Sequence, residues 1–346
     1  MPTKKPTAAL SVLPLMELSS GFWAFKTLAA ANELDLFTRL SGTRGTTAAE
    51  LAKALAIAER PAEMLLTGCA ALGLLRKKGP RYVNSPLSDH FLVRGRAHDF
   101  GGFVEMLDKR LYAGWAKLSD AIRTNRPTTW DPERQASLFD GVDPVMLSSF
   151  WQAMHSISSS TGSTLARALN WKPFKRVLDV GGGSGAIDIE LCRRHRHLQA
   201  TVYDLPHVAE IAAANVARAG LSNRVRTVGG DFFRDAIYPS GHDAMVLSLI
   251  MHDWSEADDR RVLRRCFEAL PSGGAVIICE LLVNEAKTGP VPAALMSLNM
   301  LIETSGGRNY TAGEYTAWLR DIGFRKMRTV RFKAAGADGA VIAFKP

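Results

Sequence analysis

A glycine-rich run, Gly181-Gly182-Gly183-Ser184-Gly185, follows the short apolar segment 176–180 and precedes a segment with helical periodicity. A strand, a glycine-rich turn and a helix in this order bring backbone amides and a helix N-terminus to a ligand. Through Ala186 the run also matches the pattern G-x-G-x-x-A, so a dinucleotide is one ligand that it could bind. The run alone does not decide between ligands.

Acidic residues near the ends of successive predicted strands narrow the choice. Asp179 lies two residues before the first glycine, where a carboxylate would repel a pyrophosphate and attract an amino group. Asp204 ends the second strand and can accept hydrogen bonds from both ribose hydroxyls. After the third strand, Asp231 can accept a hydrogen bond from the adenine amino group, and Phe232 can cover the ring. These residues fit S-adenosylmethionine better than a dinucleotide, and aspartates that only cap turns are the structural alternative.

His252 follows the fourth predicted strand and is the candidate general base. It lies at the carboxyl end of the sheet, where ligands bind in open α/β folds, and an imidazole titrates near neutral pH. Glu280 ends the fifth strand at the same edge, where it could orient the imidazole and stabilise its protonated form. The alternatives are a structural histidine and a solvated strand end.

The elements that must position these residues change in character near residue 175. Before this point the chain is rich in helices. After it, apolar strand-like runs alternate with amphipathic helices, which predicts a Rossmann-like, doubly wound α/β domain with a largely parallel sheet. The strands are expected at 176–180, 199–203, 225–228, 244–249, 275–281, 326–332 and 340–344. The last two have no helix between them and are expected to form an antiparallel hairpin.

A helical domain is expected to precede the α/β domain. Apolar residues recur through 15–40 as in a helix, and Thr47 with Glu50 predicts a capping box at the start of the next helix. A further helix spans 62–74, and two short strands follow within 75–83, which together give a winged-helix-like pattern. The expected domains are a winged-helix-like domain at 1–100, a helical linker at 101–172 and the α/β domain at 173–346.

In these residues the chain resembles the class I S-adenosylmethionine-dependent O-methyltransferases of the plant caffeate and bacterial polyketide-tailoring type. The resemblance covers nearly the whole chain and includes the runs 177–185, 204–206, 230–233, 252–254 and 306–308. It implies S-adenosylmethionine as cofactor, S-adenosylhomocysteine as product, no metal, and a homodimer formed by the N-terminal domain. It also implies that His252 is the base, that Glu280 flanks it, that Met154 contacts the acceptor and that Ser158 touches the cofactor carboxylate.

The expected sites can now be stated in full. The cofactor site comprises Ser158, Asp179, Gly181, Gly183, Asp204, Leu205, Asp231, Phe232 and Ser248, and the catalytic residues are His252, Glu280 and Asn309. Asn309 departs from the family, because many members have a second glutamate after the Gly-Gly-Arg run. An amide can hydrogen-bond to His252 but adds no negative charge. Either Glu280 alone supports the imidazole, or base catalysis is weaker in this chain.

The expected reaction is methyl transfer to an oxygen of a small aromatic or polyketide-like secondary metabolite. Alignment of the acceptor oxygen with the methyl carbon and the sulfur can supply much of the rate, while His252 takes the hydroxyl proton. The helical linker contributes to an apolar acceptor pocket that comprises Phe150, Met154, Trp254, Met296, Asn299 and Met300. An ordinary core is the alternative for the phenylalanine and the methionines, and a nitrogen or carbon acceptor is the alternative reaction.

A winged-helix regulator that binds DNA is the competing class of function. The chain has 43 Lys and Arg residues against 34 Asp and Glu residues, which gives a net charge of +9. Residues 1–95 contain twelve Lys and Arg residues against seven Asp and Glu residues, so the basic excess in this part is small. The segment 62–74 would be the recognition helix, yet it has no basic residue, whereas a helix that reads DNA needs hydrogen-bond donors. We therefore expect no nucleic acid partner. A nicotinamide-dependent enzyme is a second alternative.

Several features concern the compartment. No run of about 18 uncharged apolar residues occurs, so no membrane span is expected. Pro14 and Glu17 interrupt the apolar run near the N-terminus, which favours a short tail before a helix over a signal peptide. The cysteines have no metal-binding spacing and predict buried free thiols in a reducing cytoplasm; they are Cys69, Cys192, Cys266 and Cys279.

Overall fold

The computed structural model describes residues 10–96, 98–135 and 144–346, and for 144–149 only the course of a helix. Most of the expected N-terminal tail lies outside these residues. The chain forms two compact units, Met1–Asp108 and Lys109–Pro346. The finer division at residues 100 and 172 stays a prediction. In the part of the chain that the structure describes, no helix is long and apolar enough to cross a membrane.

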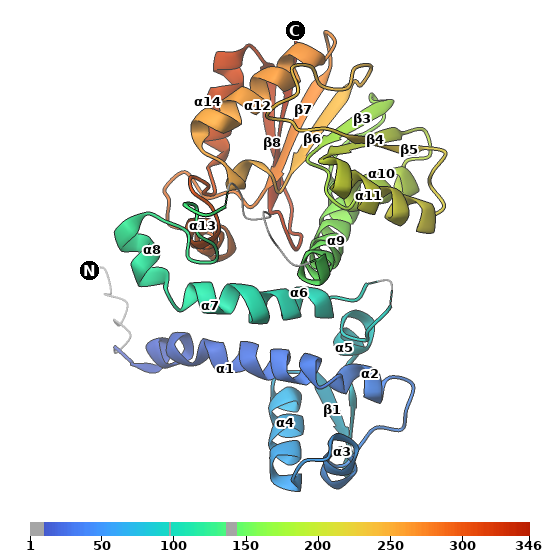
Figure 1. Ribbon diagram of the computed structural model, residues 1–346, viewed down its shortest axis with the longest axis vertical. Coiled ribbons are helices and arrows are strands. Elements are labelled where there is room, and N and C mark those ends of the chain that lie inside the picture. The colour runs from blue at the N-terminus through green and yellow to red at the C-terminus, as the bar shows by residue number, and fades with distance from the viewer. Residues whose placement is uncertain (1–9, 97, 136–143) are drawn as a thin grey trace, which may run out of the picture. The chain divides into compact units, whose positions relative to one another are not determined.

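The first unit consists of helices and one two-stranded sheet (Figure 1). The expected single helix over 15–40 is wrong: Asp35 adopts a φ of 57°, in the left-handed region, and separates two helices. Aspartate tolerates this backbone conformation better than most residues. The elements are α1 (Leu13–Glu33), α2 (Leu36–Leu40), α3 (Ala48–Leu55), α4 (Glu59–Ala71), β1 (Leu75–Lys78), β2 (Arg81–Asn84), α5 (Pro86–Phe91) and α6 (Gly101–Met106).

The expected capping box and strand pair are confirmed. The Thr47 hydroxyl accepts from the Glu50 N–H at 3.2 Å, and the Glu50 carboxylate accepts from the Thr47 N–H at 3.0 Å. Arg81 on β2 donates to both carboxylate oxygens of Glu50, at 2.6 and 2.7 Å, and so joins the antiparallel strands to α3. Beyond this order of elements, the winged-helix likeness stays a prediction.

The second unit is built on a seven-stranded sheet with the order β5-β4-β3-β6-β7-β9-β8. The strands are β3 (Arg176–Val180), β4 (Gln199–Asp204), β5 (Val225–Gly229), β6 (Ala244–Ser248), β7 (Ala275–Glu280), β8 (Arg325–Arg331) and β9 (Gly339–Phe344). The first five are parallel, and β9 is antiparallel to both β7 and β8. Every strand expected in this unit is present, and the expected hairpin is confirmed.

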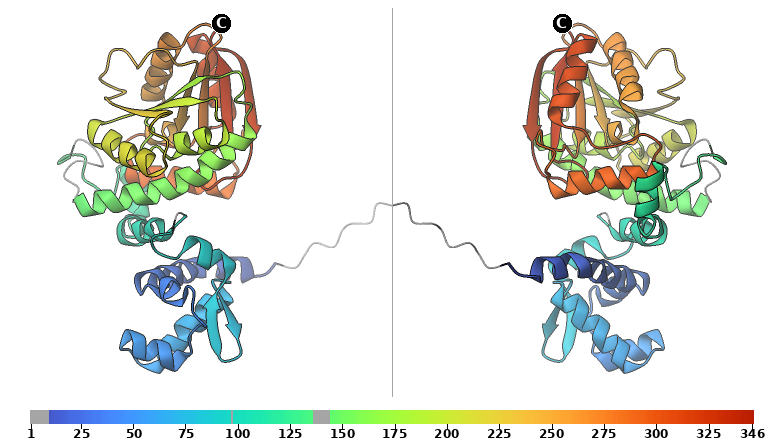
Figure 2. Two further views of the ribbon diagram at one scale, coloured as in Figure 1. Left: turned by 90° about the vertical axis from the view of Figure 1, so that its right-hand side faces the viewer. Right: turned by 90° about the vertical axis from the view of Figure 1, so that its left-hand side faces the viewer.

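Helices cover both faces of this sheet (Figures 1 and 2). The helices of the unit are α7 (Tyr112–Trp115), α8 (Leu118–Thr124), α9 (Pro144–Ala168), α10 (Ala186–Arg194), α11 (Pro206–Arg218), α12 (Glu256–Ala269), α13 (Val291–Glu303) and α14 (Ala312–Ile322), with a π-turn η1 (Leu107–Leu111) at the unit boundary and a 3₁₀ turn η2 (Met251–Asp253). Neighbouring strand residues such as Ile277 and Ile278 enter different cores, because side chains alternate across a strand. One core includes α9, α10 and α11, and the other includes α12 and α14.

The strand order places a topological switch point between β3 and β6. From β3 the chain continues to β4 and β5 on one side, and it then returns to β6 and β7 on the other side. In open α/β sheets ligands bind outside the carboxyl ends of the strands at such a point. The loops that follow β3, β4, β6 and β7 therefore define where a site is to be sought.

The outer strand β8 has a charged surface. Four of its seven residues are exposed basic residues: Arg325, Lys326, Arg328 and Arg331. Its partly buried Met327 and Val330 pack against the two cores. The strand thus contributes little apolar surface, and its exposed side chains give this edge of the sheet a positive charge.

Candidate active site

The glycine-rich loop after β3 is shaped so that side chains could not be accommodated on it. Gly181 and Gly183 have φ values of 70° and 55°, which L-residues with a side chain rarely adopt. A Cβ on Gly181 would lie 2.5 Å from Cδ1 of Ile250, and a Cβ on Gly183 would lie 3.1 Å from the Trp151 ring. Ile250 and Trp151 therefore pack directly against the loop backbone, and only glycine fits at these two positions.

Asp204 at the end of β4 holds this loop in place. One carboxylate oxygen accepts from the Gly183 N–H at 2.8 Å, and the other accepts from the Leu205 N–H at 2.7 Å. Burial raises the pKa of Asp204, while the two backbone hydrogen bonds favour its ionised form. A carboxylate has about four acceptor positions, so both oxygens keep capacity for hydroxyl donors such as those of a ribose.

The loop after β5 brings Asp231 and Phe232 to the same edge. The Asp231 carboxylate accepts from the Phe233 N–H at 2.8 Å and lies 3.4 Å from Nε of Arg234. The Phe232 ring would lie 3.3 Å from a Cβ on Gly181, so it lies against the glycine-rich loop. The structure thus brings together the loop, the carboxylate and the ring that the sequence analysis assigned to one ligand.

Two other expected cofactor residues have buried polar groups at this edge. Asp179 is 1% exposed and lies beneath the loop, since a Cβ on Gly182 would come within 2.9 Å of its carboxyl carbon. The Ser248 hydroxyl at the end of β6 is buried and has no partner among the described residues. On α9, Ser158 is half-buried, and its neighbour His155 hydrogen-bonds to the Ser184 hydroxyl of the loop at 2.9 Å.

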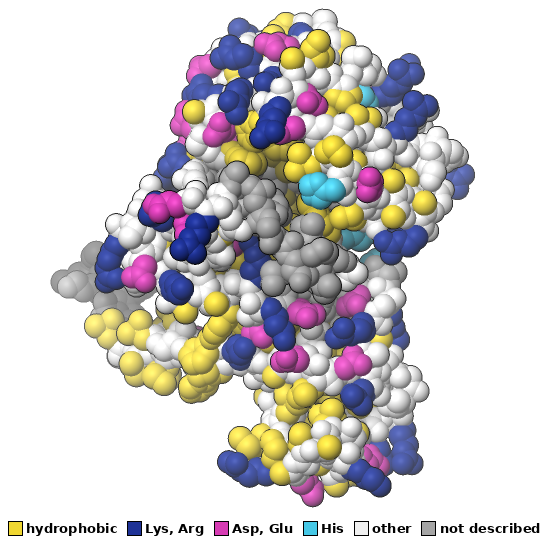
Figure 3. Space-filling model, in the orientation of Figure 1, with side chains coloured by type: hydrophobic (Ala, Val, Ile, Leu, Met, Phe, Trp, Pro, Cys, Tyr) yellow, Lys and Arg dark blue, Asp and Glu magenta, His cyan; other side chains and the backbone are white. Residues whose placement is uncertain are grey.

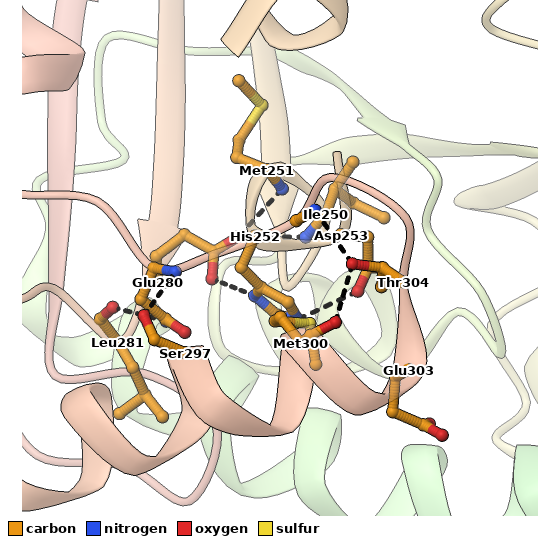
Figure 4. A network of polar contacts seen from close by, with 12 residues as sticks. Ile250, Met251, His252, Asp253, Glu280, Leu281, Ser297, Met300, Glu303 and Thr304 are labelled. Atoms are coloured by element: carbon orange, nitrogen blue, oxygen red, sulfur yellow. Dashed lines mark hydrogen bonds and ion pairs between the residues drawn. The ribbon is translucent and has the colours of Figure 1, made fainter. Parts of the chain in front are cut away.

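His252 and Glu280 form a hydrogen-bonded pair at the ends of β6 and β7 (Figure 4). The His252 Nδ1 lies 2.6 Å from Oε2 of Glu280, and both side chains are almost fully buried. The other oxygen of Glu280 accepts from the N–H groups of Ile250 and Met251, each at 3.0 Å. One carboxylate therefore fixes both the imidazole and the backbone turn from which it projects.

A second carboxylate lies on the other side of the imidazole. Oδ1 of Asp253 is 3.4 Å from the His252 Nε2. Burial lowers the pKa of His252, but the carboxylates of Glu280 and Asp253 outweigh burial and raise it to about 9. Burial raises the pKa of Asp253 to about 6. The two carboxylates thus stabilise the protonated imidazole, and the neutral form that can accept a proton becomes populated as the pH rises toward about 9.

Asn309 has different contacts from those expected. Its side-chain amide donates to the Leu281 carbonyl at 2.8 Å, and its backbone N–H donates to the Ser297 hydroxyl at 2.9 Å. Its amide oxygen is buried and has no partner among the described residues. In this position Asn309 anchors the chain after α13 to the end of β7, and no described contact joins it to His252. Its catalytic role stays a prediction.

The expected acceptor residues lie on three elements. Met296, Asn299 and Met300 are on α13, which contacts η2, the turn that contains His252. Met300 is buried near this turn, whereas Met296 packs against a small cluster of core residues. Phe150 and Met154 are on α9, and the Trp254 ring lies 4.5 Å from that of Phe233 between ring centroids. The acceptor-binding roles of all six residues stay predictions.

The sequence analysis missed residues that hold α13 in place. Arg110 pairs with Glu303 through two contacts of 3.1 and 3.2 Å, and both side chains are largely buried. The Trp115 indole N–H donates to the Asn299 side chain at 2.9 Å, and the Trp130 indole N–H donates to the Glu303 carbonyl at 2.7 Å. These partners lie far apart in the sequence, so no local pattern could have identified them. Trp151 and Asp253 were also missed, although Asp253 directly follows the candidate base.

One expectation outside the site, the state of the cysteines, can be assessed. The four cysteines are free and buried, as expected. In residues 10–96, 98–135 and 144–346, no group of three or more His, Cys, Asp or Glu side chains is arranged to hold a metal ion.

Comparisons with known proteins agree with this arrangement. Residues 115–325 match the family model of the O-methyltransferase domain, and residues 16–94 match that of the O-methyltransferase dimerisation domain. The 3-hydroxy-5-methyl-1-naphthoate 3-O-methyltransferase of Streptomyces sahachiroi is 47% identical over 332 residues, which cover 96% of this chain and 94% of the relative. The tetracenomycin polyketide synthesis 8-O-methyl transferase of Streptomyces glaucescens is 33% identical, with coverage of 96% of each chain. The crystal structure of human N-acetylserotonin methyltransferase in complex with SAM superposes with a TM-score of 0.87 at 27% identity and covers 99% of each chain.

Proposed function

The chain belongs to the O-methyltransferase family and is an S-adenosylmethionine-dependent methyltransferase, and from this premise we propose that it methylates a phenolic hydroxyl with His252 as general base. The observation that supports the base is the pair of His252 and Glu280, in which the carboxylate holds Nδ1 at 2.6 Å and leaves Nε2 on the opposite side of the ring. Because Nδ1 is committed to the carboxylate, Nε2 is the nitrogen that receives the proton.

The cofactor site is proposed to be the edge formed by the glycine-rich loop, Asp204, Asp231 and Phe232. S-adenosylmethionine supplies an electrophilic methyl group on a cationic sulfur. Asp204 is placed to accept from the ribose hydroxyls, and Phe232 is placed to cover the adenine ring against the loop. Only glycine fits at positions 181 and 183, beside Ile250 and Trp151, so the loop keeps its tight backbone conformation. Residues that hold the cofactor in this way would align it with an acceptor oxygen, and such alignment can supply much of the rate.

Proton removal then depends on the charges around His252. The two carboxylates stabilise the imidazolium that forms when the acceptor oxygen loses its proton. A phenol has a pKa near 10, so proton transfer to a histidine with a pKa of about 9 is close to balanced. An aliphatic alcohol is far less acidic, and the same histidine would help it much less. This difference favours a phenolic acceptor.

The acceptor class is proposed from the pocket and from the relatives. The relatives named above act, by their names, on a hydroxynaphthoate and in polyketide synthesis. The rings and thioethers of Phe150, Met154, Trp254 and Met300 suit a flat polycyclic acceptor. Asn299 would add a polar contact from α13. We therefore propose a hydroxylated polycyclic aromatic secondary metabolite.

The assembly is proposed to be a homodimer formed by the first unit, as its dimerisation-domain match indicates. Hydrophobic side chains gather over α1 (Figure 3). Leu18 is 79% exposed and Trp23 is 63% exposed, which is costly for an isolated copy. A cytoplasmic location also stays a prediction.

The function is tested by offering labelled S-adenosylmethionine and a panel of hydroxynaphthoates, other phenols, aromatic amines and aliphatic alcohols, with products read by mass spectrometry. The expected result is one labelled methyl group on a phenolic oxygen. Transfer to an amine alone would replace the O-methylation assignment with N-methylation. Transfer to no acceptor, together with DNA binding in a gel shift at low salt, would support the regulator instead.

A further inference from the structure

His155 on α9 lies against the glycine-rich loop and has no part in the reaction proposed above. Its Nδ1 atom is 2.9 Å from the hydroxyl oxygen of Ser184, the fourth residue of the loop. Ser184 is only 3% exposed, so its hydroxyl needs a hydrogen-bond partner within the protein. The side-chain amide nitrogen of Asn215 on α11 lies 3.3 Å from the same Nδ1 atom. His155 therefore joins α9 to the loop and to α11.

The contacts of Asn215 determine which of its side-chain atoms faces His155. The amide oxygen of Asn215 accepts from the guanidinium of Arg218, a group that can only donate. The amide nitrogen donates to the backbone carbonyl of Ser184 at 2.9 Å, and a carbonyl can only accept. A proton on Nδ1 of His155 would therefore point at the N–H donor of Asn215. The arrangement requires an unprotonated Nδ1, which accepts from the Ser184 hydroxyl.

The charges near His155 favour the same neutral form. Arg218 on α11 and Arg193 on α10 are both cationic, and Arg193 also pairs with Glu190 at 2.8 Å. Burial and these two cations lower the pKa of His155 below its usual value of 6.5. The ring is therefore uncharged at neutral pH, and its one proton is on Nε2.

A second residue of α9 holds the same part of the loop. Trp151 lies one helical turn before His155, and a Cβ on Gly183 would be 3.1 Å from the Trp151 ring. The Gly183 N–H in turn donates to Asp204, the carboxylate assigned to the ribose. The loop is thus held at Gly183 and Ser184 by α9 and by the end of β4. A shift of α9 away from the loop would alter the backbone beside the proposed ribose site.

We propose that His155 is a positioning residue for the cofactor: its unprotonated Nδ1 accepts from Ser184 and so holds the glycine-rich loop in the conformation that binds S-adenosylmethionine. This inference rests on the proposed cofactor site and adds to it a residue that acts through the loop. His155 therefore contributes to cofactor binding and not to the transfer step. Its effect on S-adenosylmethionine and S-adenosylhomocysteine is the same, because both ligands have the ribose and the adenine ring.

His155→Leu removes the acceptor and leaves the Ser184 hydroxyl buried without it. Both ligands should then bind roughly 10-fold more weakly in calorimetric titration. The KM for S-adenosylmethionine should rise to the same extent, whereas kcat at saturating cofactor should stay close to that of wild type. His155→Asn places an amide oxygen near the position of Nδ1 and should restore most of the affinity. His197→Asn is the matched control and should bind as wild type does, because His197 hydrogen-bonds to the Trp171 carbonyl instead.

The pH dependence of binding is a second measurement, and it does not require the leucine variant to fold. Protonation turns Nδ1 from an acceptor into a donor, so the affinity of wild type should fall as the pH decreases below the pKa of His155, which is below 6.5. His155→Asn cannot be protonated at this position, and its affinity should fall less over the same range. Acids of the site such as Asp204 titrate in both proteins, so the difference between the two curves isolates His155.

The proposal is overturned if a folded His155→Leu variant binds both ligands as wild type does, or if wild type and His155→Asn have the same pH curve. A lower kcat with an unchanged KM would also overturn it, because His155 would then act on the transfer step. These results leave the cofactor site intact as long as Asp204→Ala weakens binding. If Asp204→Ala also binds as wild type does, the proposed cofactor site itself is wrong.

Discussion

The Nδ1 atom of His252 lies 2.6 Å from Oε2 of Glu280, and the other oxygen of the same carboxylate accepts from two backbone N–H groups of the His252 turn. This relationship determines the tautomer of the neutral imidazole, because Nδ1 must bear the proton that Glu280 accepts. It also restricts rotation of the ring, since the ring and its backbone are held by one group. The chemistry of the site therefore depends on the Nε2 atom and on the charge that faces it.

His252→Ala should lower kcat by at least about 100-fold, since general-base catalysis is typically worth about 100- to 10,000-fold. Affinity for S-adenosylmethionine should remain nearly unchanged, because the cofactor residues lie on other loops. Steady-state kinetics and calorimetry measure the two effects separately. Near-full turnover with the true acceptor would show that positioning alone suffices and that His252 is not the base.

Glu280→Gln should reduce kcat less than His252→Ala does, on the order of 10-fold, because the amide oxygen still accepts from one side, although the charge and the acceptor on the other side are lost. Loss of the charge lowers the pKa of His252 from about 9. The rising limb of the pH–rate profile should therefore move to lower pH. A limb that stays in place would mean that the observed titration belongs to the acceptor.

Protein stability should depend on pH through His252. Its pKa in the folded state, about 9, is above the value of about 6.5 in an unfolded chain, so its stabilising contribution is complete below pH 6.5 and is lost by about pH 9. The difference in Tm between wild type and His252→Gln should thus shrink between pH 6.5 and pH 9.5. Asp253, with a pKa of about 6, has largely finished titrating before this window. A constant difference across the window would contradict the raised pKa.

Asp204→Ala should weaken S-adenosylmethionine binding by roughly 10-fold or more, since loss of hydrogen bonds to a charged group costs about 1.5–3 kcal/mol. The variant also removes the acceptor that holds the Gly183 and Leu205 N–H groups. Asp258→Ala on α12, an acid outside the cofactor loops, is the matched control in the calorimetric titration. If both variants bind as wild type does, Asp204 is not part of the cofactor site.

Leu18→Glu combined with Trp23→Glu should convert the homodimer into a monomer, because two buried charges would replace the apolar surface of α1 at the interface. Light scattering at micromolar concentration measures the mass. Lys53→Glu on the exposed side of α3 changes charge without touching this surface and should leave the dimer intact. A wild-type monomer under these conditions would count against the assembly itself.

The inner strands β3, β6, β7 and β9 could be located from the sequence because each is a short apolar run, and this signal is local. The break between α1 and α2 at Asp35 could not be predicted from the sequence, because a single left-handed residue leaves the apolar periodicity of the two helices unchanged. The sequence also predicted which loops lie together at the candidate cofactor site, since parallel strands bring their carboxyl ends to one edge of the sheet. The contact of Arg110 with Glu303 spans 193 residues, and the Asn309 contact with Leu281 spans 28, so only the fold brings them together.

The basic residues of β8 have a consequence for the sheet as a whole. An outer strand offers unpaired N–H and C=O groups, and in other proteins such an open edge serves as a template for fibre growth. Two copies that met along β8 would oppose Arg325, Lys326, Arg328 and Arg331 with the same four cations. Repulsion between these like charges thus protects the edge from pairing with a second copy, without a helix or loop to cover it. Part of the +9 net charge therefore serves to keep copies apart along the sheet, which is a different task from attracting an anionic partner.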